Sequence, residues 1–155
     1  MKYLCLSILT ILLVSCDSGR IYEDNIDFDQ LVWRKEKVPE FAFEIEDAKV
    51  PYNILINVRN GFDYPFYNLY YQYELTDSIG RTLDKDMKEL ILFDAKTGEP
   101  FGSGLGDMFD HQEPVLENYH FPSSGQYTIA FTHFMRPDTL PLILSVGARV
   151  EKAEY

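Results

Sequence analysis

Apolar and polar side chains alternate along several short stretches of this chain of 155 residues, and this alternation restricts its fold more than any other feature. Successive side chains of a β-strand point to opposite faces, so a period of two residues predicts a strand with one buried face. The clearest stretch runs from residue 67 to residue 75. Its expected buried face carries Tyr67, Leu69, Tyr71, Tyr73 and Leu75, and its other face carries Asn68, Tyr70, Gln72 and Glu74.

Similar alternation, or a compact apolar run, predicts further strands. These strands are expected at residues 41–45, 52–59, 88–94, 126–134 and 142–150. Turn signals separate them: the Asn60-Gly61 dipeptide, residues 76–80, and residues 94–98, where Gly98 fits a left-handed position. Residues 84–92 could instead form a turn or two of helix. Short strands at near-regular spacing predict an all-β fold, an antiparallel β-sandwich of about seven or eight strands.

The first sixteen residues have the features of a bacterial lipoprotein signal. Lys2 gives a positive start, residues 4–14 form an apolar run too short to span a bilayer, and Ser15 precedes Cys16. Lipoprotein-processing enzymes cleave before such a cysteine and attach acyl chains, palmitate among them, which hold the protein on a membrane. We therefore predict lipid attachment at Cys16. The alternative is an ordinary secretory signal with a chance cysteine.

Three parts of the chain follow from this reading. They are a cleaved lipoprotein signal peptide over residues 1–15, a polar tether over 16–27 and one β-sandwich domain over 28–155. A mature chain of this length is in the usual range for one domain.

Charge and cysteine content exclude several classes of function. The chain has 14 Lys and Arg against 25 Asp and Glu, a formal net charge of −11, which argues against a nucleic-acid partner. The same balance disfavours electrostatic adhesion to anionic lipid, so a lipid anchor would have to hold the protein on its membrane. Cys5 lies in the signal and Cys16 is the anchor, so the folded body has no disulfide, thiolate metal site or cysteine nucleophile.

A glycine-rich segment, Gly102-Ser103-Gly104-Leu105-Gly106-Asp107, has two possible readings. Glycine-rich loops can hold a phosphate against backbone N–H groups, but that site needs a following helix and usually a lysine. No helical pattern and no lysine follow here. We therefore expect a bulged turn or an irregular edge strand in which backbones approach closely.

Polar residues near this segment are close enough in sequence to suggest a metal or catalytic site. The group formed by Asp107, Asp110, His111 and Glu113 matches neither the EF-hand spacing nor a two-histidine zinc signature, which favours a solvated acidic loop. His133 shares a strand face with Phe131, so a hydrogen-bonded structural role is expected for it. No catalytic residue, metal ligand or cofactor-binding residue is predicted, and we expect no enzyme activity.

Tyrosines in the 64–73 region could serve either the core or a partner. Core packing and cross-strand pairing are the simpler reading. Alternatively, Tyr70 and Tyr64 could form an exposed interaction surface for a protein or a sugar, because tyrosine is enriched at interfaces. The polar neighbours of Tyr70 on its strand face, Asn68 and Gln72, leave both readings open.

An ordered set of segments resembles the gliding-motility lipoprotein GldH family of Bacteroidota over nearly the whole chain. The segments are the Ser15-Cys16-Asp17-Ser18 start, Trp33, residues 51–60, Tyr64 to Leu69, residues 101–107, 121–127, 133–136 and 146–150. The resemblance implies a non-enzymatic accessory lipoprotein of the gliding motility and type IX secretion machinery. It implies no cofactor, no metal and no catalytic residue.

The same resemblance implies where the protein acts and with what. Its partners would be the membrane, through the acyl anchor, and other cell-envelope lipoproteins of the gliding and secretion machinery, whose assembly or stability it would support by protein–protein interaction. The expected location is the cell envelope, lipid-anchored, at the outer membrane. The alternative function is that of a surface glycan-binding lipoprotein, because aromatic-rich β-sandwiches on bacterial surfaces often bind polysaccharide.

Overall fold

The computed structural model describes residues 19–153, and the predicted signal peptide and Cys16 lie outside this range. The described chain folds into strands joined by turns and one short 3-10 helix, η1 (Asp29–Leu31). The strands are β1 (Arg20–Asp27), β2 (Val32–Arg34), β3 (Glu40–Ile45), β4 (Tyr52–Gly61), β5 (Asn68–Asp77), β6 (Thr82–Ile91), β7 (Ser103–Leu105), β8 (Met108–Tyr119), β9 (Gly125–His133), β10 (Thr139–Pro141) and β11 (Ile143–Lys152).

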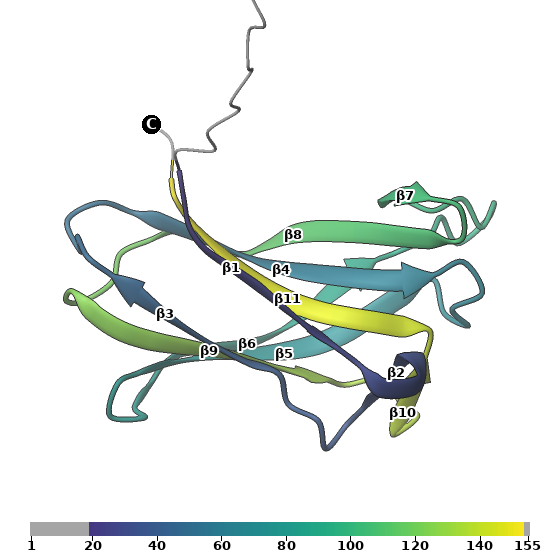
Figure 1. Ribbon diagram of the computed structural model, residues 1–155, viewed down its shortest axis with the longest axis horizontal. Helices are drawn as coiled ribbons and strands as arrows, with labels where there is room; N and C mark the ends of the chain where they lie inside the picture. The colour runs from purple at the N-terminus through teal and green to yellow at the C-terminus, as the bar shows by residue number, and fades with distance from the viewer. Residues whose placement is uncertain (1–18, 154–155) are drawn as a thin grey trace, which may run out of the picture.

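Two antiparallel sheets face each other and form a β-sandwich (Figure 1). One sheet has the order β1-β11-β4-β8-β7 and the other the order β3-β9-β5-β6, while β2 and β10 form a small separate ribbon. Eight of the strands have six residues or more, and the other three have three residues each. The predicted all-β sandwich is confirmed.

The inner faces of both sheets are those that the alternation predicts. Ile54, Ile56 and Val58 of β4 are buried, as are Leu69, Tyr71, Tyr73 and Leu75 of β5. The predicted inner residues of β3 and β9 are buried too: Phe41, Phe43, Ile45, Tyr127, Ile129 and Phe131. Tyr67 is the exception, because β5 begins at Asn68 and the Tyr67 side chain is 46% exposed.

Aromatic rings join the two sheets across the core. Phe121 lies between β8 and β9, and its ring contacts Phe43 of β3, Tyr52 of β4, Tyr119 of β8 and Tyr127 of β9, with centroids 4.5 to 6.0 Å apart. Such pairs contribute about 0.5–1.5 kcal/mol each beyond the burial of their area. The Phe121 ring therefore connects strands of both sheets within the core.

The β2–β10 ribbon seals the opposite end of the sandwich. Trp33 of β2 is fully buried, stacks on Phe28 with centroids 5.5 Å apart, and donates a hydrogen bond from Nε1 to the Lys37 carbonyl oxygen at 2.9 Å. The His133 ring meets the Trp33 ring edge-on at 5.2 Å. His133 is fully buried, as a structural role requires, but neither of its ring nitrogens has a hydrogen-bond partner among the described residues, so the expected hydrogen bond is not found.

The predicted tether over residues 16–27 is wrong from residue 20 onward. Residues 20–27 are strand β1, which pairs along its length with β11 from Arg20↔Glu151 to Asp27↔Ser145. Tyr22 and Ile26 of β1 pack against the core, while charged and amide side chains cover its outer face. An edge strand with one polar face can have the same composition as a polar tether. The two can be told apart only when the strand with which the segment pairs is known.

Four further local expectations are also corrected. Residues 84–91 form part of β6, so the helix considered for 84–92 is not present there, and the predicted acidic loop around Asp110 is the start of strand β8. The Asn60-Gly61 dipeptide continues β4 and does not turn, because Asn60 is fully buried and Gly61 pairs with Met108. In β11 a register shift after Ile143 places Ile143 in the core instead of Leu142 and Leu144.

The glycine-rich segment forms the short edge strand that was expected. A Cβ atom at Gly102 would lie 2.7 Å from the Asp110 carbonyl oxygen and 2.7 Å from His111 Nε2. A Cβ atom at Gly104 would lie still closer to its neighbours, which are the Met108 carbonyl oxygen and the Phe109 ring. Close approach of β7 to β8 therefore requires glycine at both positions.

We expect Gly102→Ala to destabilise the fold by about 1–3 kcal/mol, the usual cost of forcing an extra methyl into a packed site. Chemical denaturation of the full chain measures this loss. The matched control is Ser103→Ala at the next residue, the first of β7, where the side chain is exposed and stability should hold. Equal stability of the two variants would contradict the close approach of β7 to β8.

Two buried histidines should make the stability depend on pH between pH 7 and 5. Burial lowers the pKa of both His111 and His133 below the ordinary value of 6.5. The unfolded chain therefore binds protons near pH 6 that the folded chain does not, so stability is complete above about pH 6.5 and falls as pH decreases. Each histidine contributes a slope of at most about 1.4 kcal/mol per pH unit.

Denaturation curves collected from pH 7 to 5 test this dependence, since carboxylates with a lowered pKa, such as Glu74 and Asp77, lose their contribution only at lower pH. His133→Phe should flatten the curve, whereas replacement of the exposed His120 by Gln should leave it unchanged. An unchanged slope in His133→Phe would show that His133 does not titrate differently in the two states.

Candidate functional site

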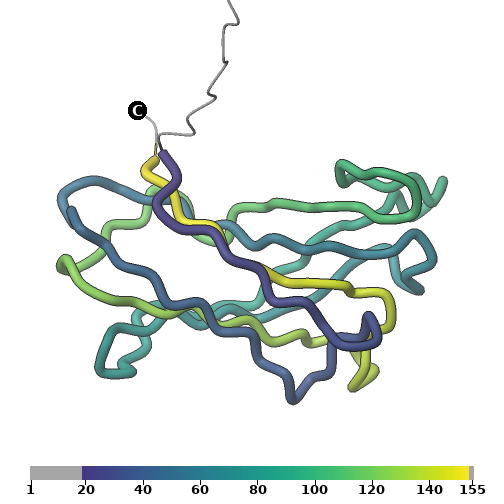
Figure 2. The backbone as a smooth tube through the Cα atoms, viewed as in Figure 1, coloured from purple at the N-terminus to yellow at the C-terminus, as the bar shows by residue number. Residues whose placement is uncertain are grey.

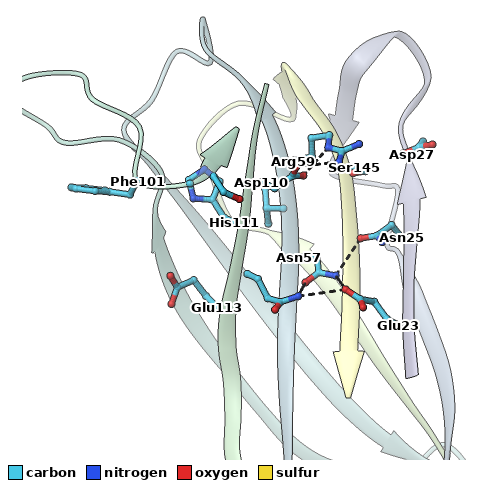
Figure 3. A pocket seen from close by; sticks show the side chains of 14 residues that line it. Glu23, Asn25, Asp27, Asn57, Arg59, Phe101, Asp110, His111, Glu113 and Ser145 are labelled. Atoms are coloured by element: carbon cyan, nitrogen blue, oxygen red, sulfur yellow. Dashed lines mark hydrogen bonds and ion pairs between the residues drawn. The ribbon is translucent and has the colours of Figure 1, made fainter. Parts of the chain in front are cut away.

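A polar groove of about 620 Å³ crosses the outer face of the five-stranded sheet (Figure 3). Its floor combines side chains from strands that are far apart in the sequence: Glu23 and Asn25 of β1, Asn57 and Arg59 of β4, and Asp110 and Gln112 of β8. The pairings Asn57↔Gln112 and Arg59↔Asp110 place these side chains in cross-strand rows.

Hydrogen bonds join the side chains of the groove to one another. Asn57 Nδ2 donates to Glu23 Oε1 at 3.0 Å, and Gln112 Nε2 donates to Asn57 Oδ1 at 2.8 Å. Partial burial acts to raise the pKa of Glu23, but hydrogen bonds from Arg20 and Asn57 and nearby positive charge leave this pKa below its ordinary value. Glu23 is therefore ionised at neutral pH, and it accepts hydrogen bonds from Asn57 of β4, Gln112 of β8 and Arg20 of its own strand.

An ion pair joins the two side chains of the other cross-strand row, Arg59 and Asp110. The Arg59 guanidinium donates to both Asp110 carboxylate oxygens, at 2.7 and 3.1 Å. About half of each side chain is exposed, so water screens this pair and its contribution to stability is small. Because the groove carries Glu23, Asp27, Asp110 and Glu113 against Arg59, its overall charge is negative.

Gly147 at the centre of β11 allows β1 to lie close to this face. A Cβ atom at Gly147 would overlap the Asn25 side chain and approach the Asp24 carbonyl oxygen at 2.5 Å. Asn25 thus lies directly over the β11 backbone, and its Oδ1 accepts a hydrogen bond from Asn57 Nδ2 at 3.4 Å. The groove is built on a backbone contact that a larger residue would disrupt.

The acidic group singled out from the sequence is divided between the two faces of β8. Asp110 points outward and pairs with Arg59, whereas His111 pairs in register with the inward-facing Val58 and is buried beneath Gly102. Asp107 lies in the exposed β7–β8 turn. Among residues 19–153 no group of three or more His, Cys, Asp or Glu side chains has the geometry to hold a metal ion.

Tyr70 lies on the outer face of the four-stranded sheet and is 39% exposed. A hydrogen bond with Glu89, its cross-strand partner on β6, raises the pKa of the Tyr70 hydroxyl. The Asn68 amide donates to the same carboxylate at 2.6 Å. The backbone N–H of Phe134 donates to the Tyr70 carbonyl oxygen at 2.8 Å, which places Phe134 beside Tyr70. The exposure that an interaction surface at Tyr70 requires is present.

Tyr64 does not share this surface, so its assignment to an exposed interaction surface is wrong. Its side chain is only 5% exposed, its ring packs edge-on against Phe66, and its hydroxyl donates to the Asn68 carbonyl oxygen at 3.2 Å. Burial raises the pKa of this hydroxyl far above its ordinary value. The Tyr64 ring packs inward because the connection between β4 and β5, to which it belongs, covers the end of the core.

A second apolar surface, not singled out from the sequence, lies where the β4–β5 connection meets the β7–β8 hairpin. We call it the apolar tip; it consists of Phe62, Leu105 and Met108, which are 52%, 89% and 49% exposed. The backbone N–H of Phe62 donates to the Asp107 carbonyl oxygen at 2.8 Å, which joins the two turns. In the sequence, the only sign of this surface is an apolar residue, Leu105, between Gly104 and Gly106.

Comparisons with known proteins identify relatives of this chain. Residues 20–150 match the family model described as GldH lipoprotein. In the described part of the chain, no helix is long and apolar enough to cross a membrane. The solved structure of the enzymatically active domain of bacteriophage CBA120 tailspike protein 4 aligns with 85% of this chain and 17% of its own at 11% identity, and its TM-score of 0.26 carries no argument.

Two curated relatives match the chain from end to end. A protein of Christiangramia forsetii named gliding motility lipoprotein GldH homolog is 31% identical, over 93% of this chain and 91% of the relative. The gliding motility lipoprotein GldH of Flavobacterium johnsoniae is 26% identical, over 96% of this chain and 95% of the relative. The chain therefore belongs to the GldH lipoprotein family.

Proposed function

We propose that this lipoprotein is an accessory component of the gliding motility and type IX secretion machinery. It acts by protein–protein contact and supports the assembly or stability of partner lipoproteins in the cell envelope. The observation that carries this proposal is membership of a family whose curated relatives are named for gliding motility, over nearly the whole chain. The chain acts as a binding module and not as an enzyme.

The surface of the sandwich supports a contact function. Tyr70 is an exposed aromatic ring on an open sheet face, and tyrosine is among the residues that contribute most to binding energy at interfaces. The polar groove on the other sheet has its principal amide and carboxylate groups bonded to one another. We therefore assign the partner contact to the Tyr70 face in preference to the groove.

The anchor fits this role. Acylation at Cys16, with palmitate among the chains, would hold the sandwich at the outer membrane and raise its effective concentration near other anchored proteins. An acidic chain gains little from anionic head groups, so membrane attachment depends on the acyl chains.

Cys16→Ala should abolish incorporation of an alkyne-tagged fatty acid and release the protein from membranes, because the acyl chains supply the attachment. Labelling of growing cells followed by membrane fractionation measures both effects. Cys5→Ala is the matched control, since Cys5 lies inside the predicted signal and its loss should leave labelling intact. Continued labelling of Cys16→Ala would contradict lipid attachment at this residue.

Tyr70→Ala should weaken partner binding with a stability loss of less than about 0.5 kcal/mol, because the side chain lies at the surface. Crosslinking and affinity purification from native membranes measure the recovery of other envelope lipoproteins, and thermal unfolding measures stability. Tyr64→Ala is the matched control and should cost about 3–5 kcal/mol, since its buried ring leaves a cavity.

Two outcomes would count against this assignment of the contact face. Full recovery of partner lipoproteins by Tyr70→Ala would remove Tyr70 from the contact. Saturable binding of the lipoprotein to surface polysaccharide, lost in Tyr70→Ala, would instead support a glycan-binding function.

A further inference from the structure

The described chain begins close to the predicted lipid attachment. Three residues separate Cys16 from Arg20, where β1 starts, so the acylated residue lies within about 14 Å of the sandwich even if this link is fully extended. The register Arg20↔Glu151 and Glu151↔Asn53 places this point level with the start of β4. We call this the anchored end of the sandwich.

The apolar tip lies at the other end of the same strands. Gly61, the last residue of β4, pairs with Met108, and Met108 pairs with Leu105 across the β7–β8 turn. Since β4 has ten residues, the tip is about 30 Å from the anchored end along the strand. Figure 2 shows the start of the described chain and this hairpin at separate ends of the molecule.

Exposed apolar side chains gather at the end that carries the tip. On the five-stranded sheet they are Phe62, Leu105 and Met108, and at the same end of the facing sheet they are Tyr67, Ile91 and Phe134. At the anchored end, Ile79 in the β5–β6 turn is the most exposed apolar side chain. Single exposed apolar residues are ordinary on protein surfaces, but a cluster of them indicates a contact site.

The apolar tip is held in place before any partner arrives. Phe62, Phe93 and Phe109 form a triangle of rings with centroids 6.3 to 6.4 Å apart, and Phe93 is buried. This triangle fixes the two turns against each other. A surface that is already ordered loses less conformational entropy on binding than a mobile loop does.

Charge around the apolar tip specifies its partner. Asp63, Asp107 and Glu99 are exposed near the tip, against one basic side chain, Lys96, in the neighbouring turn. Arg59 is paired with Asp110 and adds no net charge. A partner surface that complements this arrangement is apolar with basic residues at its border.

We propose that the apolar tip docks a partner protein of the cell envelope through an apolar surface bordered by lysine or arginine. This inference rests on the proposed contact function and adds a second surface to it, on the side turned away from the lipid anchor. The acidic border disfavours the head groups of an anionic membrane, and the anchor already occupies the opposite end.

Site-specific photocrosslinking in living cells tests the proposal with the full lipidated protein. A photoreactive phenylalanine replaces Leu105 in one strain and Ile79 in another. Both side chains are highly exposed, Leu105 at the end of β7 and Ile79 in the β5–β6 turn, and they differ in the end of the sandwich that they occupy. We expect an adduct from position 105, with its crosslinked peptide identified by mass spectrometry in an envelope protein, and none from position 79.

Two further variants, made in the strain that carries the photoreactive residue at position 105, test the chemistry of the partner. Met108→Lys removes an exposed apolar contact, and Asp107→Lys reverses the acidic border; each should reduce the adduct by about tenfold or more. Lys96→Glu should leave the adduct in place or increase it. Thermal unfolding of each variant verifies that the fold is retained.

Three outcomes would overturn the proposal. The first is equal adducts from positions 105 and 79, the second is an adduct with lipid or with a second copy of this chain, and the third is an adduct that Asp107→Lys does not reduce. Deletion of the protein separates this test from the proposed function. If deletion lowers the levels of partner lipoproteins while position 105 gives no adduct, the accessory role stands and the docking surface fails. If deletion changes no lipoprotein while the adduct forms, the docking surface stands and the accessory role fails.

Discussion

Packing of aromatic rings around Phe121 is the interaction on which the rest of the structure depends. This ring lies where the chain crosses from one sheet to the other, and it contacts rings from β3, β4, β8 and β9. The described body contains no cysteine, so no disulfide can hold the sheets together. Exported proteins often use disulfides for this purpose; here aromatic area and shape take over that role.

The outer faces can therefore vary without loss of the fold. One sheet presents a polar row built on Glu23, Asn57 and Gln112, and the other presents Tyr70 beside Phe134. These surfaces share no side chain with the Phe121 cluster.

The sequence predicts the inner faces well, because a period of two residues is a local property that tertiary contacts reinforce. Ile54, Ile56 and Val58 illustrate this agreement. It fails for β1, where Tyr22 and Ile26 are the only apolar inner residues and the pairing partner is more than 100 residues away. It also fails for β8, because Pro114 and three acidic residues hide its alternation.

The candidate surfaces are less accessible to sequence analysis, for a physical reason. Tyr70 and Tyr64 belong to the same aromatic-rich stretch, yet one faces water and the other covers the end of the core. Strand register decides the position of Tyr70, and the path of the β4–β5 connection decides that of Tyr64. The groove requires the pairing of β1, β4 and β8. Local patterns contain no information on which strands become neighbours.

Strand β1 also determines how the molecule bears mechanical load. Force from the membrane enters at Arg20, the first residue of a strand whose backbone is bonded to β11 from Arg20 to Asp27. Tension between the anchor and the far end of the sandwich runs along β1, so it shears these hydrogen bonds together and does not open them one at a time. A strand placed in shear resists pulling better than one that unzips, because its hydrogen bonds must break together.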